Sequence, residues 1–384
     1  MFPDRSPATL RRAGLGLDAA NFFLADVRAG LGPYLAIYLL TVQKWDQQSI
    51  GVVMSIATIA GVLAQTPAGA LVDATRAKRG LMAVAAFAAT AACLLLPWLP
   101  SFWPVAVSQA AAQAAAAVFE PALTAVTLGV VGRKLFARRI GRNEFFNHAG
   151  NVFAAGVAGL AAYWFGPVVV FYLLAAMALA SFLSVLIVPA AAIDHDAARG
   201  LDEVPSGKAP SGWMSLMHCR PLLIFAVCVV LFHLANAAML PLVGQQLASQ
   251  NEKLGTTLMS VCIVAAQVVM LPMALLVGAK ADAWGRKPLF LLGFFILLLR
   301  AVLYTLSDQA WWLLGVQLLD GVGAGIFGAL FPVIVADIMR GTGRFNLAQG
   351  VINTALGIGA ALSTSLGPVR ALFMVPARQQ KAAI

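Results

Sequence analysis

The sequence predicts an all-α membrane protein with two helical bundles, of six and five transmembrane helices. Its composition is the first reason: 61% of its 384 residues are hydrophobic and 11% are charged, whereas soluble domains have roughly 45–50% and about 25%. The second is that apolar runs long enough to cross a bilayer recur along the chain, since one crossing needs about 20 residues. Little chain remains for a soluble catalytic domain, so we expect no enzyme, no catalytic residues and no cofactor.

The apolar runs fall into two groups separated by a polar linker. The first six lie at residues 17–40, 50–72, 81–99, 102–131, 145–165 and 168–189, and the last five at 222–243, 256–277, 289–306, 311–338 and 347–366. Residues 193–220 are rich in Asp, Glu, Pro and Gly, which is typical of a loop. The predicted organisation is therefore an N-terminal bundle at 1–192, a cytoplasmic linker at 193–220, and a C-terminal bundle at 221–384 that ends in a short polar tail without a twelfth span.

The basic residues indicate the orientation of the chain. Nearly all Lys and Arg in the loops fall on one side, and the opposite loops carry only Lys44 and Lys253. Because basic loops stay in the cytoplasm, we expect the N-terminus inside a bacterial-type inner (plasma) membrane that the chain crosses many times. The net charge of +10 is thus explained by loops and predicts no nucleic-acid partner. The four cysteines form no CxxC pair, so no metal site is predicted.

Internal repeats connect the two groups of spans. Residues 22–26 (FFLAD) match 232–236 (FHLAN), and the pattern GxxxD occurs at 69–73 and again at 278–282. A third match places Arg142, Asn147 and Asn151 at the same spacing as Arg344, Gln349 and Asn353. Duplicated halves with a site at their interface are common among transporters.

Residues 278–287 (GAKADAWGRK) look like the GxxxDxxGRK signature of the major facilitator superfamily, and residues 69–79 are a weaker copy with Arg76 where glycine is usual. The resemblance implies a two-bundle secondary transporter that works by alternating access and has a cytoplasmic gate at this motif. The candidate gate residues are Gly69, Asp73, Arg76, Gly278, Asp282, Gly285, Arg286 and Lys287. Each motif aspartate can accept backbone N–H bonds at a helix end or pair with a cation, for which Arg133 and Arg340 are candidates.

Charged or polar side chains also occur near the centre of several spans. A charge there costs about 2.5–3.5 kcal/mol, so it persists when it is paired, hydrated or functional. The candidate solute- and proton-binding residues are Asp26, Arg28, Glu120, His233, Asn236, Arg300 and Asp320. On charge grounds Arg28 can pair with Glu120 and Arg300 with Asp320. Structural alternatives are an Arg300–Asp320 pair between adjacent helices, and His233 and Asn236 as hydrogen bonds between helices.

These residues predict a secondary active transporter for a small solute. The chain has no nucleotide-binding motif, so we expect an ion gradient to drive it, most simply protons bound by Asp26 or Glu120. The prediction is proton-coupled efflux by a monomer in the lipid bilayer. The alternative is proton-coupled uptake of a small metabolite, for which Arg28 and Arg300 suggest an anion. A membrane enzyme or scaffold is the competing class, but no cluster of His, Asp or Glu at the membrane interface favours it.

Overall fold

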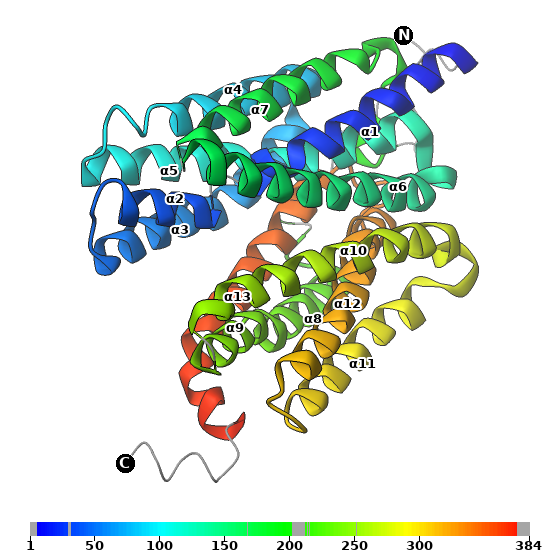
Figure 1. Cartoon of the computed structure of the whole chain (residues 1–384). Coiled ribbons are helices and arrows are strands. Elements are labelled where there is room, and N and C mark those ends of the chain that lie inside the picture. The colour runs from blue at the N-terminus through cyan, green and yellow to red at the C-terminus, as the bar shows by residue number, and fades with distance from the viewer. Residues whose placement is uncertain are drawn as a thin grey trace.

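Two helical halves, joined along part of their length, make up the computed structural model of the chain (Figure 1). It describes residues 6–29, 32–166, 168–201, 212, 214, 216–250 and 252–374, except the side chains of 26, 28, 29, 32, 33, 248, 252–257 and 367–374. Within these residues all regular elements are helices. The all-α, two-bundle class predicted from the sequence is confirmed.

The N-terminal half contains seven helices and two short 3₁₀ turns. They are α1 (Pro7–Ala29), α2 (Gly32–Thr41), α3 (Gln47–Ala74), α4 (Lys78–Leu94), α5 (Phe102–Ala116), α6 (Phe119–Phe165), α7 (Val169–Ile187), η1 (Ala190–Ala192) and η2 (Ala197–Arg199). The C-terminal half contains α8 (Arg220–Asn236), α9 (Met239–Gln250), α10 (Glu252–Trp284), α11 (Arg286–Tyr304), α12 (Ala310–Ile338) and α13 (Phe345–Met374).

These helices account for all eleven predicted spans, although the boundaries differ. In the described residues, eight helical segments are long and apolar enough to cross a membrane, and one of them, Phe102–Phe165, covers both the fourth and the fifth predicted span. The first predicted span is divided between α1 and α2, and α4 is a shorter helix of 17 residues. The structure is therefore consistent with six plus five crossings.

Two spans expected to be continuous are interrupted near their middle. The fourth span is interrupted at residues 117–118 and the seventh at residues 237–238. A proline follows each break in the first turn of the next helix, as Pro121 and Pro241. Proline lacks the N–H that an interior turn must donate, but the first turn of a helix does not require it. Interrupted helices are common where a transporter binds its solute.

The predicted loop between the fourth and fifth spans is also replaced by helix. Within α6 only Gly132 departs from helical geometry, with φ 65° and ψ 176°. This left-handed φ suits glycine, which has no Cβ to collide with the backbone. The fifth span therefore begins at residue 133, and its basic residues lie on helical turns. Arg139 and Arg142 bind Asp18 of α1 there, with Nη2 to carboxylate distances of 2.8 and 2.6 Å.

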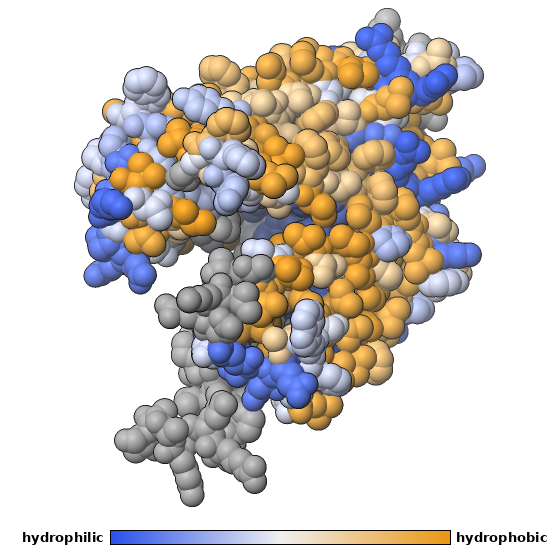
Figure 2. All heavy atoms as spheres, in the orientation of Figure 1, coloured by the Kyte–Doolittle hydropathy of each residue, from blue (hydrophilic) through white to orange (hydrophobic). Residues whose placement is uncertain are grey.

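The two halves touch at one end and separate at the other. We call the touching end the basic end; it carries the N-terminus, the turns after α3 and α10, and residues 190–201. Figure 2 shows a hollow between the halves on the side away from the N-terminus, with an apolar outer surface beside it. Exposed aliphatic and aromatic side chains of α4, α7 and α11, such as Phe87, Leu179 and Phe295, belong to this outer surface, as expected for helices in lipid.

Candidate functional site

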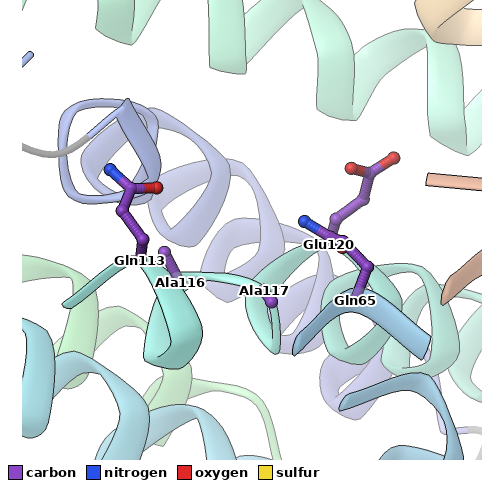
Figure 3. Close-up of a pocket in the computed structure, with 5 residues that line it drawn as sticks. All are labelled: Gln65, Gln113, Ala116, Ala117 and Glu120. Atoms are coloured by element: carbon purple, nitrogen blue, oxygen red, sulfur yellow. The ribbon is translucent and has the colours of Figure 1, made fainter. Parts of the chain in front are cut away.

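A cavity of about 160 Å³ lies on the N-terminal half, beside the interface with the other half. It is lined by Gln65 of α3, by Gln113, Ala116 and Ala117 at the end of α5, and by Glu120 at the start of α6. In Figure 3 the side chains of Gln113 and Glu120 extend to the same side, with the two alanines between them, and Gln65 reaches toward them from α3. The break in the fourth span thus places two polar side chains at the cavity.

Hydrogen bonds between the two halves lie next to this cavity. Asn353 of α13 donates from Nδ2 to Oε2 of Glu120 at 3.3 Å. One turn further along α6, the Thr124 hydroxyl donates to Oε1 of Gln349 at 2.9 Å, and the hydroxyls of Thr66 and Thr354 are 2.9 Å apart. Glu120 therefore lines the cavity and also joins the halves.

Toward the basic end, glycines let the helices of the two halves touch through their backbones. A methyl group on Gly69 of α3 would collide with the carbonyl oxygen of Asn346 in α13. On the other side of the interface, Gly141 of α6 packs against Gly278 of α10, where a methyl group on Gly141 would lie 2.7 Å from the Gly278 Cα. Small residues permit such close approach of membrane helices. Both motif glycines, Gly69 and Gly278, thus close the basic end.

Asp73, in the weaker copy of the motif, joins the two halves. It is 3% exposed, and its carboxylate accepts from the backbone N–H groups of Asn346 and Leu347 at 3.2 and 2.8 Å and from Asn346 Nδ2 at 2.8 Å. These amides begin α13, where the helix dipole favours a negative charge. Of the two predicted modes, Asp73 therefore uses the helix end, while the suggested partner Arg133 donates to the carbonyl of Ala336 at 2.8 Å.

The ion pairs of the stronger copy of the motif stay within the C-terminal half. Asp282 pairs with Arg286 at 2.6 Å, Arg286 pairs with Asp337 at 2.9 Å, and the side chain of Asp282 is 57% exposed. Gly285 has a φ of 84°, which explains the glycine of the signature. Arg76 stands where Gly285 stands in the stronger copy, and it has no positive φ. The backbone of the first-half turn therefore differs from that of the second half. Arg76 and Lys287 are both exposed.

Residues 190–201 pack between the halves at the basic end. The Asp194 N–H donates to the carbonyl of Gly129 in α6 at 3.0 Å, and the Gly341 N–H donates to the carbonyl of Gly200 at 2.7 Å. Asn346 Nδ2 donates to the carbonyl of Ala198 at 3.0 Å. Burial lowers the pKa of the nearby His195, and the positive charges of Lys78, Arg76 and Arg199 lower it further. The start of the predicted linker is thus part of the closed end.

The predicted pairing of Arg300 with Asp320 is present, away from the cavity. Arg300 is 2% exposed, and its Nη1 donates to Oδ1 of Asp320 and to Oδ1 of Asn236, at 2.6 Å each. Asp320 also accepts from Gln317 Nε2 at 2.9 Å. All these residues belong to the C-terminal half, so the group joins α8, α11 and α12. The Arg300–Asp320 pair thus connects adjacent helices, which is the structural alternative given for it above.

The remaining predicted site residues have different outcomes. Among the described residues His233 makes no hydrogen bond between helices, unlike the structural alternative: its Nδ1 lies 3.0 Å from the carbonyl of Val229 in its own helix, and its ring packs on Phe327. The side chains of Asp26 and Arg28 lie outside the described residues, so their roles and the pairing of Arg28 with Glu120 stay predictions.

The structure corrects one register of the repeat. Gly141 packs on the carbonyl of Ala274, and Gly350 packs on the carbonyl of Gln65. Both corresponding pairs are 209 residues apart (350 − 141 and 274 − 65), whereas the match of Arg142, Asn147 and Asn151 to Arg344, Gln349 and Asn353 implies 202. The alignment of the two halves at these polar residues was therefore wrong by seven residues, about two helical turns. In the corrected register Glu144 corresponds to Asn353.

Some residues of this interface were not selected from the sequence. Gln65, Gln113 and Gln267 are neutral amides, which also serve as ordinary bonds between helices, so they carry no distinct signal. The predicted fifth span starts at residue 145, which places Glu144 just before it and His148 in its first turn, near a basic loop. Because the helix begins at residue 133, they instead lie several turns inside it.

Two similar helical halves, with a polar cavity beside their interface and closely packed glycines at one end, are typical of a membrane transporter. The sequence model of the Major Facilitator Superfamily matches residues 17–369, and the chain belongs to this family. It is a transporter and not an enzyme, as predicted.

Relatives and solved structures agree with this assignment. An uncharacterized MFS-type transporter, found in two strains of Mycobacterium tuberculosis, is 59% identical over 92% of this chain and 85% of its own length. Among solved structures, the transporter FucP in the outward conformation superposes with a TM-score of 0.70, at 14% identity over 93% of this chain and 92% of that chain. The proton:xylose symporter XylE gives 0.66, at 13% identity over 95% and 89%. At such identities these structures show the fold alone.

Proposed function

We propose that the chain is a proton-coupled transporter of a small, uncharged polar solute, and that Glu120 carries the coupling proton. One observation carries this proposal: the same carboxylate lines the cavity and accepts a hydrogen bond from Asn353 in the other half. A change in the charge of Glu120 therefore alters the solute site and the contact between the halves together. Such a link is what alternating access with coupling requires.

The lining of the cavity supports the solute class. Two glutamine amides offer both donors and acceptors, and the lining residues that the structure describes include no basic side chain. Arg300, one of the two cations that suggested an anionic solute, is already bound to Asp320 and Asn236. A volume of about 160 Å³ is below the roughly 300–1,000 Å³ of sites for drug-sized ligands. These features favour a small hydroxyl-bearing solute, the class to which the xylose carried by the proton:xylose symporter XylE belongs.

The proton acts through the hydrogen-bonding role of the carboxylate. Ionised Glu120 only accepts hydrogen bonds, from Asn353 and from solute hydroxyls; protonated Glu120 can also donate one. Binding a proton removes the negative charge from a partly buried site, so movement of the occupied site through the hydrocarbon costs less free energy. Rocking of the halves about the cavity then exposes the site to each side in turn.

The positive-inside pattern supports a cytoplasmic basic end. In that orientation the N-terminus is inside the cell, and the hollow of this conformation opens outward. A membrane-impermeant thiol reagent added to intact cells should label Ser101→Cys at the hollow end and leave Ala77→Cys at the basic end unlabelled. The reverse labelling would contradict this orientation.

Replacement of Glu120 by glutamine should separate coupling from solute movement. In proteoliposomes with a pH gradient of one unit and the membrane potential held at zero, one-to-one coupling of solute and proton drives at most about tenfold accumulation of solute. We expect wild-type protein to accumulate one member of a panel of labelled pentoses, hexoses and nucleosides. Glu120→Gln, which mimics the protonated carboxylate, should lose accumulation and keep exchange of labelled for unlabelled solute. Asp308→Asn, in the loop before α12, is the matched control and should behave as wild type.

The sign of the gradient tests the direction. The predicted efflux requires accumulation in vesicles with an acidic interior, because protons then leave as solute enters. Uptake, the alternative, requires accumulation from an acidic exterior. Full gradient-driven accumulation by Glu120→Gln would contradict the role of this carboxylate in either direction.

A further inference from the structure

A second polar group joins the halves on the opposite side of the interface, between α6 and α10. His148 of α6 is buried, and its Nδ1 lies 2.7 Å from Oε1 of Gln267 in α10. Its Nε2 is buried without a hydrogen-bond partner in the described residues and lies 3.9 Å from Oε2 of Glu144, one turn earlier in α6. Glu144 Oε2 accepts from Asn147 Nδ2 at 3.1 Å. The proposed function does not use these residues.

Comparison with the repeat-related position in the other half indicates that helix packing alone does not require this polar group. In the corrected register His148 corresponds to Gly357 of α13, which packs directly on Val62 of α3, where a Cβ would lie 2.5 Å from Val62 Cγ2. The contact of α3 with α13 therefore closes through a glycine and an aliphatic side chain. The contact of α6 with α10 uses an imidazole, an amide and a carboxylate in the equivalent place, and buried polar groups are costly unless they are satisfied.

The hydrogen-bonding roles show what is missing between His148 and Glu144. Because Gln267 Oε1 is an acceptor, the Nδ1 atom of His148 carries the hydrogen of that bond. In neutral histidine Nε2 is then an acceptor, and the ionised carboxylate of Glu144 is an acceptor as well. These two acceptors face each other at 3.9 Å with no donor between them in the described part of the chain, and a single proton supplies one.

We propose that Glu144 and His148 together form a second proton-binding site, which holds one proton between His148 Nε2 and Glu144 Oε2. The proton arrives from hydronium: its O–H bond breaks, leaving water, and an N–H bond forms at Nε2. The products are an imidazolium and a carboxylate, which attract each other. Every nitrogen of His148 is then a donor, with Gln267 and Glu144 as acceptors.

Among the described side chains, the other charged groups near this site have partners of their own. On α1, Asp18 is bound by Arg139 and Arg142, and the side chain of Asp26 lies outside the described residues. From α10 the facing side chain is the neutral Gln267. From α12 the facing residue is Gly328, whose Cβ position lies 3.7 Å from Glu144 Oε2.

Occupation of the site strengthens the contact between the halves. A charged imidazolium donates a stronger hydrogen bond than a neutral imidazole, so the bond from Nδ1 to Gln267 tightens when the proton binds. Release of the proton weakens this bond and leaves two acceptors facing each other. The site therefore favours the conformation closed at the basic end when it is protonated. This inference extends the proposed function, but it does not depend on Glu120.

A titration followed by nuclear magnetic resonance tests the proposal on the full chain in lipid nanodiscs. The chain has four histidines, so ¹⁵N-labelled imidazoles give few signals, and ¹³C-labelled glutamate carboxyls report on Glu144. His148→Gln and Glu144→Gln assign the two signals. We expect both signals to move with one common midpoint as the pH changes, and we expect Glu144→Gln to lower the proton affinity of His148 by about tenfold or more.

Two controls separate this site from the coupling site. His233→Gln removes a histidine that bonds only to its own helix among the described contacts, and Glu120→Gln removes the proposed coupling carboxylate; neither should change the His148 titration. Separate midpoints for His148 and Glu144, or a His148 signal that stays neutral at every pH, would overturn the proposal, whether or not Glu120→Gln loses coupling.

Discussion

Substitution of Arg300 by methionine is expected to destabilise the C-terminal half by about 3–5 kcal/mol, because it leaves Asp320 in a buried place without its cation. The Arg300 side chain is 2% exposed and that of Asp320 13%, so water replaces the lost interaction poorly. Asn236 loses its donor in the same change. The thermal unfolding temperature of the purified protein in detergent measures the loss. Arg286→Ala, which breaks a more exposed pair, is the control and should cost at most about 1 kcal/mol.

A double variant separates a structural role of this pair from a role in solute binding. Apolar residues often replace a buried ion pair without loss of stability. Arg300→Met combined with Asp320→Leu should therefore recover most of the stability, although Asn236 still lacks its donor. We also expect it to transport, since neither residue lines the cavity. A stable double variant without transport would contradict the structural role and support the original hypothesis that Arg300 and Asp320 bind solute.

Substitution of Gly69 by alanine is expected to prevent closure of the basic end and to abolish gradient-driven accumulation of solute. The added methyl group would collide with the carbonyl oxygen of Asn346, and overpacking of this kind costs about 1–3 kcal/mol. The cost applies only to the closed conformation. Separation of α3 from α13 relieves it, so the equilibrium should shift toward opening by roughly 5- to 150-fold.

Gly51→Ala is the matched control, because it lies in the same helix and nothing is within 4 Å of its Cβ position. Both changes gain the same helix propensity of up to about 1 kcal/mol, so a difference between them reports the contact with Asn346. Transport by Gly69→Ala at the rate of Gly51→Ala would show that this approach is not needed for the cycle.

The sequence predicted the fold well because membrane helices leave a strong signal. Long apolar runs, basic loops on one side and the doubled motif were enough for the class, the halves and the family. Helix breaks were harder to predict, since the interruptions before Pro121 and Pro241 occur inside apolar runs. The start of the fifth span was misplaced because Arg139 and Arg142 looked like loop residues, whereas in the structure they bind Asp18 on a helix.

The site was predicted only in part, because charge identifies unusual residues but not their neighbours. Glu120 was selected as a candidate solute- and proton-binding residue and lies at the cavity beside the interface, and Arg300 was correctly paired with Asp320. The sequence does not show where each side chain lies within its half, so Arg300 and the residues that it binds were assigned to a common cavity. The bonds of Asp73 to the start of α13 also depend on how two distant segments meet.

Distances between the halves at both ends test the central claim most directly, namely that the halves rock about the interface at Glu120. Spin labels are placed on Ala77 and Ala283 at the basic end and, in a second sample, on Ser101 and Gln309 at the hollow end, after replacement of the four native cysteines. On addition of the transported solute at constant pH, we predict that the basic-end distance lengthens in part of the molecules while the hollow-end distance shortens. Unchanged distances, or a change of the same sign at both ends, would contradict the account.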